Sequence, residues 1–435
     1  MSTEVHEPPP DAVDADVAAF SAAGATATDV IADSLGEYAR IWWTRVRGGE
    51  SGALPVVIGL AVIVAYFQIR SSQFLSAENL VNLMTQAGWL VAIGMAEVFV
   101  LLLGEIDLSI GYSSFMGATL TLWMVQPPHP APLWIAVIAG LAIPTAFSAI
   151  QGAIVCWLRL PSFVVTLAGL LMGQGLLLYM FNALSPNTGG TIRLYSNVIR
   201  DLEAGEMTPV VGWIVMAVAV VLCAVFFVLR DTRRRSSGLA APPVSVTALK
   251  VAVMAIAGVV LVVIGNTNRG LGLTVVQGLP WVVLVILLLL AAWSMLLSRT
   301  KFGRYVYAIG GNPEAARRAG ISLTRTRVAA FALCGLTAGV MGIIYASNVD
   351  SVSNDVDGGQ YVLYAVAAAV IGGTSLFGGR GRMLGAVLGG LIVAVIYNGL
   401  GLLGFGAPAQ DMWTAAVLLA AVTVDAVARR RSSIR

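Results

Sequence analysis

Apolar runs long enough to cross a lipid bilayer constrain this chain more than any other feature. A membrane-spanning helix needs about 20 predominantly apolar residues. Twelve runs approach that length, at residues 52–69, 82–103, 107–125, 133–157, 163–183, 210–229, 248–265, 280–298, 327–347, 360–376, 384–404 and 411–428. Charged residues make up 11% of the chain, against about 25% in a soluble globular domain. We therefore predict an all-α polytopic membrane protein with about 12 transmembrane helices. The Gly-rich runs 107–125 and 360–376 are candidates for broken or re-entrant helices.

The distribution of Lys and Arg predicts the orientation of the chain. Cytoplasmic loops of membrane proteins collect basic residues. With the N-terminus inside, all but four of the 26 Lys and Arg residues fall on the cytoplasmic side, the exceptions being Arg70, Arg193, Arg200 and Arg269. Both termini are therefore expected to be cytoplasmic.

The remaining segments divide the chain into parts. Residues 1–47 form an acidic, Pro-containing stretch that we expect to be a largely disordered cytoplasmic tail. Residues 48–428 form the transmembrane domain, interrupted by a basic cytoplasmic linker at 230–247 and a cytoplasmic loop at 299–327. Residues 429–435 form a basic cytoplasmic tail.

The cytoplasmic loop contains one short helix with clear end signals. Asn312 is a favourable N-cap, Pro313 fits the first helical position, and Glu314 suits the positive end of the helix dipole. Gly320 can take the left-handed conformation that closes a helix. Because so short a helix is marginal alone, we expect the bundle or a partner chain to hold it. An ordinary basic loop is the alternative interpretation.

Polar side chains within the apolar runs are the other functional candidates. Glu97 is a lone acid in the middle of a run, and such acids mark functional sites by default. Asp107 and Ser109 lie at the start of the next run, where helix capping is the favoured explanation and a functional site the alternative. Gln174 and Asn398 are intramembrane amides, which most often form hydrogen bonds between helices.

Several kinds of chemistry are excluded by residue type. A phosphate-binding loop needs Lys followed by Ser or Thr, but Lys250 and Lys301 are the only lysines and precede Val and Phe. The chain has two His and three Cys residues without paired spacing. We expect no catalytic centre, no metal site and no cofactor, and any ATP hydrolysis must occur on another chain.

Five blocks of the sequence together resemble one family. They read GEIDLSIG, LPSFVVTLAGLLMGQG, KFGRYVYAIGGNPEAARRAGI, AAAVIGGTSLFGGRGRMLGAVLGG and YNGLGLLG. Over roughly residues 74–184 and 280–428 the chain resembles the permease subunits of bacterial sugar ABC importers of the ribose, xylose, arabinose and galactose type. The basic, Pro-containing segment Arg230–Thr247 is similar to the insertions of xylose-type members. Without the runs at 210–229 and 248–265, the count falls to the ten spans of shorter members.

The resemblance implies a function and a set of partners. It implies a multi-pass protein of the bacterial cytoplasmic (inner) membrane that moves a monosaccharide, with xylose a candidate, by alternating access. Two permease chains, expected to be a homodimer in membrane lipid, would form the pathway. ATP-binding subunits would dock inside and a sugar-binding protein outside, and no nucleic acid is involved. The coupling helix that enters the ATPase would comprise Gly311, Asn312, Pro313, Glu314, Ala315, Ala316, Arg317 and Gly320.

Two departures from the family pattern affect the pathway candidates. Gln174 stands where many members have Arg, and Glu97 stands where they usually have an apolar residue. A branched-chain amino-acid permease of the same superfamily remains an alternative. A proton-coupled secondary transporter would instead use Glu97 or Asp107 as a relay and would work alone in liposomes. A membrane scaffold would show no substrate dependence.

Overall fold

The structure, a computed structural model, describes residues 54–406 apart from 128–129, 187–188, 239–240 and 271–273, together with 36, 37, 40, 408–416, 419 and 423. The chain divides into two compact units. One comprises Ser51–Val215 and Val260–Arg435, and the other comprises Met1–Glu50 and Met216–Val259. The predicted C-terminal tail, and all of the predicted N-terminal tail except residues 36, 37 and 40, lie outside the described part.

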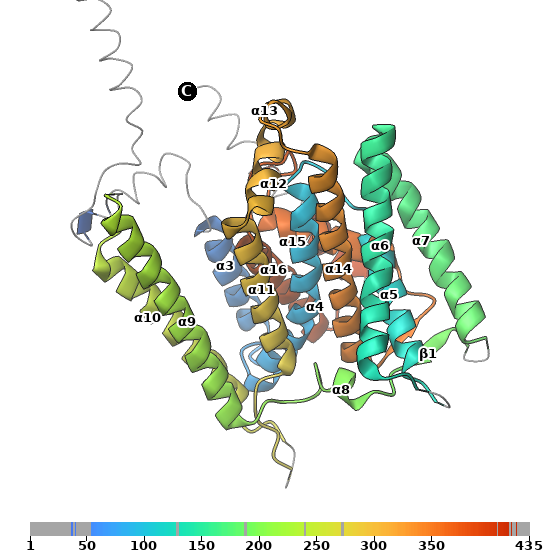
Figure 1. The fold of residues 1–435 in the computed structure, drawn as a ribbon. Coiled ribbons are helices and arrows are strands. Elements are labelled where there is room, and N and C mark those ends of the chain that lie inside the picture. Colours follow the sequence, from blue (N-terminus) through green and yellow to red (C-terminus); the bar gives the residue numbers. More distant parts are fainter. Residues whose placement is uncertain are drawn as a thin grey trace, which may run out of the picture. The chain divides into compact units, whose positions relative to one another are not determined.

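Helices dominate the described residues. In chain order they are α3 (Leu54–Arg70), α4 (Ala77–Leu101), α5 (Ile110–Met124), α6 (Leu133–Leu158), α7 (Ser162–Leu184), α8 (Asn197–Arg200), α9 (Pro209–Ser236), α10 (Val244–Gly265), α11 (Trp281–Arg299), α12 (Lys301–Gly311), α13 (Pro313–Arg318), α14 (Leu323–Val349), α15 (Gly358–Ile371) and α16 (Met383–Leu402) (Figure 1). Two three-residue strands, β1 (Thr191–Arg193) and β2 (Ser351–Ser353), complete the structure.

The prediction of an all-α polytopic membrane protein is confirmed. Eight of the described helices are long and apolar enough to cross a membrane, namely α4, α6, α7, α9, α10, α11, α14 and α16. Helices α3 and α15 are shorter but also apolar. The twelfth predicted run, 411–428, lies mostly outside the described residues, so the count of about 12 spans stays a prediction.

Helix α4 forms the centre of the larger unit. It packs against α11, α14, α15 and α16 (Figure 1), and 83% of its most apolar stretch is buried. The Trp89 ring lies between 5.5 and 6.3 Å from the rings of Tyr345, Tyr361, Tyr364 and Tyr397, mostly edge-on or tilted. Such geometry adds about 0.5–1.5 kcal/mol per pair beyond area burial, so the cluster locks α4 to α14, α15 and α16.

Helix α14 approaches its neighbours through glycine. A Cβ atom on Gly335 would lie 2.1 Å from the carbonyl oxygen of Pro144 in α6, and one on Gly342 would lie 2.2 Å from that of Ser114 in α5. Membrane helices associate closely where small residues permit backbone contact. The glycine richness of the sequence therefore has a direct packing role at this interface.

Helices α5 and α15 are too short to cross a membrane alone. Their 15 and 14 residues span about 21–22 Å at 1.5 Å per residue, against a hydrocarbon thickness of about 30 Å. Both belong to the Gly-rich runs for which broken helices were expected. Their first turns meet, because a Cβ atom on Gly111 would lie only 1.9 Å from the Gly358 carbonyl oxygen. Polar backbone at membrane depth is tolerated where it is buried in protein or lines a cavity.

The two strands join distant parts of the chain. Strand β1 follows α7, β2 follows α14, and the two pair antiparallel with Ile192 opposite Val352. Both of these side chains are buried. The Asn354 N–H extends the pairing by donating to the Gly190 carbonyl at 2.8 Å. The pairing thereby holds the segment 354–357, which leads into α15.

Candidate functional site

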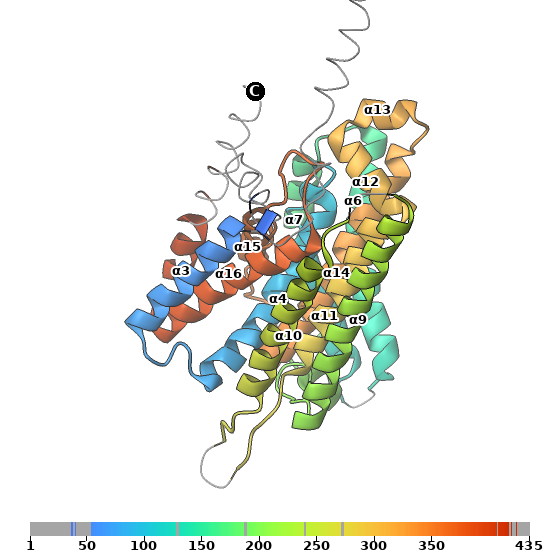
Figure 2. The same cartoon turned by 90° about the vertical axis from the view of Figure 1, so that its left-hand side faces the viewer.

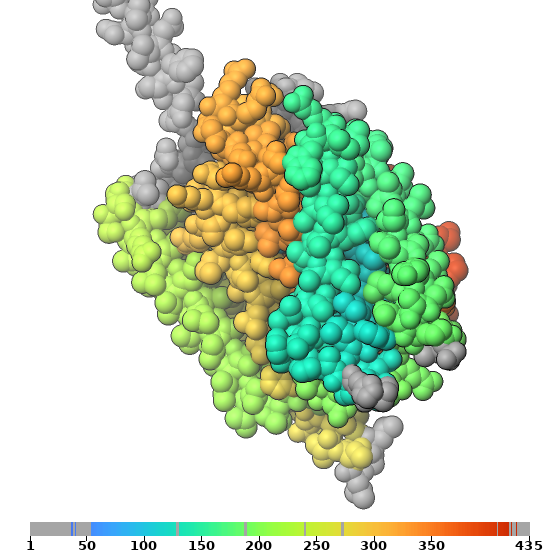
Figure 3. Space-filling view, turned by 45° about the vertical axis from the view of Figure 1, so that its right-hand side comes forward, coloured from blue at the N-terminus to red at the C-terminus, as the bar shows by residue number. Residues whose placement is uncertain are grey.

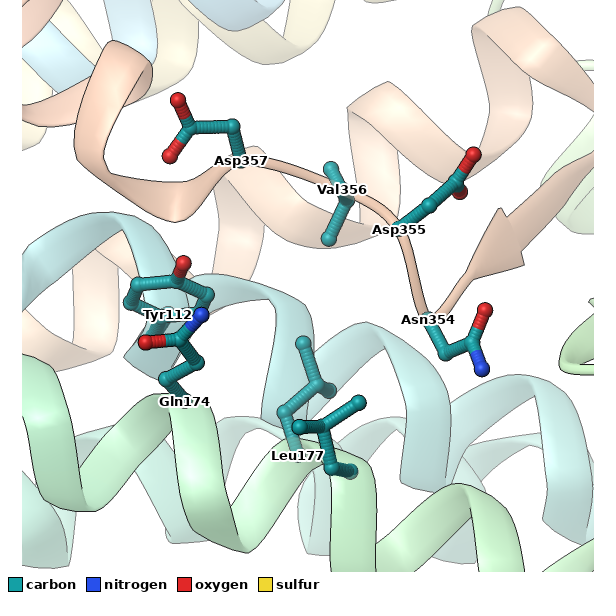
Figure 4. A pocket seen from close by; sticks show the side chains of 8 residues that line it. Tyr112, Gln174, Leu177, Asn354, Asp355, Val356 and Asp357 are labelled. Atoms are coloured by element: carbon teal, nitrogen blue, oxygen red, sulfur yellow. The ribbon is translucent and has the colours of Figure 1, made fainter.

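A polar cavity of about 200 Å³ lies where α5, α7 and the segment 354–357 meet. One water molecule needs about 10–15 Å³, so the cavity has room for a small polar solute. Figure 4 shows Tyr112 and Gln174 side by side, across from the segment that carries Asn354, Asp355 and Asp357. The lining residues are Tyr112, Gln174, Leu177, Leu178, Asn354, Asp355, Val356 and Asp357.

Local structure fixes the position of each polar group. Tyr112 is in the first turn of α5 and is 5% exposed. Gln174 is in the middle of α7 and is exposed. Asp357 is the N-cap of α15, and its carboxylate accepts a hydrogen bond of 2.9 Å from the Gly359 N–H. The cavity is therefore built on the start of α5, the middle of α7 and the N-cap of α15.

The lining is chemically suited to a neutral, hydroxyl-rich solute. It offers a phenol, two amides and two carboxylates, with no Lys or Arg among the lining residues. Amide and carboxylate groups accept hydrogen bonds from hydroxyls, and the phenol and amides can also donate. Two carboxylates disfavour a negatively charged solute. Gln174, a predicted pathway residue, lies in this lining, whereas Glu97, Asp107, Ser109 and Asn398 do not.

Asp107 is the centre of a buried polar network beside the cavity. Its Oδ1 accepts hydrogen bonds from the N–H and the hydroxyl of Ser109, at 2.9 and 2.6 Å. Its Oδ2 accepts from the Ser148 hydroxyl of α6 at 3.0 Å. Gln151 of α6 donates to the Ser109 hydroxyl at 2.8 Å. The network fixes the segment before α5 to α6.

Glu97 joins this network from α4. Its Oε1 accepts a hydrogen bond of 3.2 Å from the Asp107 N–H, and both side chains are fully buried. Within the part of the chain that the structure describes, neither acid forms an ion pair, and Glu97 Oε2 has no hydrogen-bond partner. The two acids, identified separately in the sequence, are thus in contact.

The capping interpretation of Asp107 and Ser109 needs correction in one detail. Ser109 occupies the N-cap position of α5, but its side chain makes no capping hydrogen bond. The reason is that its hydroxyl is already engaged, as donor to Asp107 and acceptor from Gln151. Asp107 instead accepts the Ser109 N–H and orders the turn before the helix.

Asn398 has an interhelical role in the structure. The Asn79 side chain of α4 donates to Asn398 Oδ1 of α16 at 2.9 Å and to the Phe74 carbonyl at 2.8 Å. Both amides are largely buried. Such pairing between membrane helices agrees with the general expectation for intramembrane amides.

The predicted short helix of the 299–327 loop is present as α13. Asn312 Oδ1 accepts a 3.0 Å hydrogen bond from the Ala315 N–H, and Pro313 is the first helical residue. At the other end, the Gly320 N–H donates to Arg317 O and the Ile321 N–H donates to Ala316 O. Together with φ of 80° at Gly320, these bonds form a Schellman closure. Figure 2 shows α13 beyond the end of α11.

Two features of this loop differ from the expectation. The residues Lys301–Gly311, taken as loop, form helix α12, because the Thr300 hydroxyl caps it and Val306 and Ile309 bury one face. In addition, Ala316 is 4% exposed and packs inward, whereas Ala315 is exposed. The outer surface of α12 and α13 forms the projection at the top of Figure 3.

Helix α12 is tied to the segment that leads to the polar network. A Cβ atom on Gly310 would lie 1.8 Å from the Leu102 carbonyl oxygen, just after α4. The Tyr307 hydroxyl donates to Gly381 O at 2.9 Å. Arg327 of α14 forms an ion pair with Glu105 at 3.3 Å. The chain from Leu102 to Ser109 thus connects the α12–α14 region to the start of α5.

These features define a class of protein. A bundle of long apolar helices, with a polar cavity lined by the shortened helix α5, by α7 and by the segment before α15, and with a short capped helix outside the bundle, is the architecture of a membrane permease. The chain belongs to the family described as "Branched-chain amino acid transport system / permease component", which matches residues 79–422.

Individual relatives narrow the comparison. The chain is 34% identical over 394 residues to the xylose transport system permease protein XylH of Escherichia coli (strain K12), covering 88% of this chain and 96% of XylH. It is 32% identical over 372 residues to XylH of Haemophilus influenzae, covering 85% and 95%. The ribose import permease protein RbsC of Escherichia coli (strain K12) is 30% identical over 369 residues, covering 85% and 92%. No solved structure matches the chain.

Sequence reasoning missed most of the cavity lining. Tyr112 lies within the run predicted at 107–125, and nothing in its type distinguishes it. Asn354, Asp355 and Asp357 did give a signal, since they form an acid-rich connection directly before the Gly-rich run 360–376. Ser148 and Gln151 are polar residues of an apolar run, and the same criterion that selected Gln174 would have selected them.

Proposed function

We propose that this chain is the membrane permease of an ATP-driven importer of a neutral monosaccharide, with xylose or a similar pentose as the first candidate. The observation that carries the proposal is the similarity over most of the chain to a xylose and a ribose permease. The cavity supports it, because its lining of amides, carboxylates and a phenol suits a hydroxyl-rich solute without charge.

ATP hydrolysis is proposed to occur on separate cytoplasmic subunits. The sequence has no phosphate-binding loop with its Lys, and α13 offers a short, exposed and rigidly capped surface. We propose that α13 seats in a groove of the ATPase and passes its closure to the bundle. The contacts of α12 and Arg327 with the Leu102–Ser109 segment provide a connection to the cavity. A sugar-binding protein would deliver substrate from outside.

A second copy of the chain is proposed to complete the pathway. Gln174 lines the cavity on one side of α7, while Leu171 and Met172 of the same helix are 64% and 60% exposed. An apolar helix face beside a polar cavity suits a permease–permease interface, and the homodimer is the simplest assembly. Such a dimer would enclose the exposed side of the cavity.

Reconstitution tests the proposed function directly. The chain would be placed in liposomes with its ATPase and sugar-binding protein, and uptake of xylose, ribose and leucine would be compared. We expect pentose uptake that requires ATP and both partners. Uptake by the permease alone, driven by a proton gradient, would support a secondary transporter. Uptake of leucine only would support a branched-chain amino-acid permease.

Cysteine labelling tests the proposed orientation. In a background without Cys156, Cys223 and Cys334, a cysteine replacing Ser236 at the end of α9 should resist an impermeant maleimide in intact cells. A cysteine replacing the exposed Tyr195, after α7, should react. The reverse pattern would overturn the orientation with both termini inside.

Blocking the cavity should uncouple hydrolysis from transport. Gln174→Trp adds bulk beside Tyr112, so we expect uptake to fall by about tenfold or more while ATPase stimulation by the loaded binding protein remains. Gln174→Asn, which keeps the amide, should retain most uptake. As a control, Val62→Trp places the same ring at an exposed apolar position of α3, away from the cavity lining. If Gln174→Trp transports normally, the cavity is not on the pathway.

A further inference from the structure

The transport proposal assigns no role to the hairpin formed by α9 and α10. Of the most apolar stretches of α9 and α10, 6% and 11% are buried within the chain. Side chains such as Leu222, Val225 and Ile256 are exposed on them. Helices that are apolar all round and of this length are membrane spans, with their apolar side chains in the hydrocarbon. The hairpin is therefore a lipid-facing part of the protein.

Helix α9 is longer than the hydrocarbon core. Its 28 residues extend about 42 Å, against a core of about 30 Å. The apolar residues run from Val210 to Leu229, and Arg230 is the first charged residue after them. The last two turns of α9 therefore project past the hydrocarbon at the depth of the lipid headgroups.

Positive charge is concentrated in these two turns. Residues 230–250 contain the cations Arg230, Arg233, Arg234, Arg235 and Lys250 and a single acid, Asp231. Arg233, Arg234 and Arg235 are exposed. They form what we call the basic end of the hairpin.

The single acid does not neutralise the basic end. Asp231 is 3% exposed, accepts a 2.6 Å hydrogen bond from the Thr247 hydroxyl of α10, and pairs with Arg230 at 2.9 Å. Arg230 in turn lies over the Phe227 ring at 5.5 Å. The acid thus serves to join the two helices, and the exposed Arg233 and Arg234 keep their charge for an external anion.

We propose that the basic end of the hairpin binds the headgroups of anionic phospholipids. Clusters of Lys and Arg directly beyond a membrane helix attract anionic lipids. The planar guanidinium of Arg can donate two parallel hydrogen bonds to a phosphate group. The exposed Arg side chains at this end of the hairpin lie at headgroup depth. The anions present at that depth are the headgroups of anionic phospholipids. The inserted helices anchor the permease in anionic membrane.

A local fluorescence measurement tests this inference on the full chain. A fluorophore on a cysteine replacing the exposed Ser237, in a background without native cysteines, reports the lipids beside the basic end. Quenching is measured with phosphatidylglycerol or phosphatidylcholine that carries a nitroxide in the upper acyl chain. We expect phosphatidylglycerol to quench more strongly at equal mole fraction, and high salt to weaken the preference.

Matched variants separate charge from structure. Arg233→Gln with Arg234→Gln should reduce the preference for phosphatidylglycerol by roughly tenfold. Arg233→Lys with Arg234→Lys keeps the charge and should retain the preference. Arg317→Gln with Arg318→Gln removes two charges from α13, outside the bundle, and should also retain it.

Three results would overturn the inference. One is equal quenching by the two lipids in the unmodified hairpin, which would leave the cations as determinants of topology only. Another is an unchanged preference for phosphatidylglycerol in the variant with Arg233→Gln and Arg234→Gln. The last is a loss of the preference in the variant with Arg233→Lys and Arg234→Lys as well as in the Gln variant. The loss would then come from a change of structure and not of charge.

Discussion

Replacing Ala315 with Arg is expected to abolish substrate-stimulated ATP hydrolysis and sugar uptake together. Ala315 is exposed on α13, so a long charged side chain there would prevent this face from seating in a groove of the ATPase. No packing within the bundle is disturbed, and we expect membrane insertion and thermal stability to remain close to those of the unmodified chain. The loss is expected to be nearly complete, because α13 cannot pass the closure of the ATPase to the bundle unless it is bound in the groove.

The neighbouring positions should behave differently. Ala316 is buried, so Ala316→Arg should distort the loop itself and lower stability as well as coupling. Gly320 has φ of 80°, and a Cβ atom on it would have no heavy atom within 4 Å. Gly320→Val therefore meets no steric contact. The helix closure would nevertheless force Val into a left-handed backbone conformation, which costs about 1–2 kcal/mol. It should weaken the Schellman closure and reduce coupling partially.

The measurement is reconstitution with the ATPase and the sugar-binding protein, following complex assembly, ATP hydrolysis and uptake. Ser298→Arg is the matched control, since it adds the same side chain at an exposed position near the end of α11 and should leave coupling intact. If the Ala315→Arg protein assembles, hydrolyses and transports normally, α13 is a connector and the coupling proposal is wrong.

The contrast between α13 and the cavity shows what the sequence could predict. The short helix is specified locally: Asn312, Pro313 and Gly320 act within a few residues of one another, so their types and spacing were sufficient. The apolar runs were equally readable, because each span must satisfy its own backbone hydrogen bonds in lipid. Helix α12 was missed since its stability depends on burying Val306 and Ile309 against the bundle.

The cavity depends on contacts between distant residues. Strand β2 pairs with β1, more than 150 positions away in the chain, and this pairing places Asp355 and Asp357 opposite Tyr112 and Gln174. No local signal in Ser351–Ser353 specifies that register. No local signal specifies the Glu97–Asp107 contact either. Each acid was identified separately as an unusual residue of an apolar run, but the hydrogen bond between them was not predicted.

Two conservative substitutions at this contact, Asp107→Asn and Glu97→Gln, are expected to differ strongly in their effect on stability and uptake. Asp107 accepts four hydrogen bonds, two on Oδ1 from Ser109 and two on Oδ2, from the Ser148 hydroxyl and, at 4.0 Å, from the Cys334 thiol. Asn can accept on one oxygen only, and its NH₂ group would face a donor. Asp107→Asn therefore takes the acceptor away from the Ser148 hydroxyl, which must reorient or stay unpaired, at a cost of about 1–3 kcal/mol.

Glu97→Gln should be tolerated, because a neutral amide keeps the Oε1 acceptor for the Asp107 N–H and burial of a charged group in hydrocarbon is costly in any case. We expect Asp107→Asn to lower the thermal midpoint and reduce uptake to about one tenth or less, since the start of α5, which carries Tyr112, loses the link from Asp107 to Ser148 of α6. Glu97→Gln should cause only a modest loss, because the driving force comes from the ATPase.

Thermal unfolding in detergent and uptake in proteoliposomes at several pH values measure both effects. Ser148→Ala provides the matched control, because it removes only the hydrogen bond from Ser148 to Oδ2. Its defect should fall between those of the other two variants. The expected order is Asp107→Asn, Ser148→Ala, Glu97→Gln: the first sets an NH₂ group against the Ser148 hydroxyl, the second removes that hydroxyl with its hydrogen bond, and the third keeps its hydrogen bond. Complete inactivation by Glu97→Gln at normal expression, or loss of a pH dependence that the unmodified chain shows, would instead identify Glu97 as a proton relay and favour the secondary-transporter mechanism.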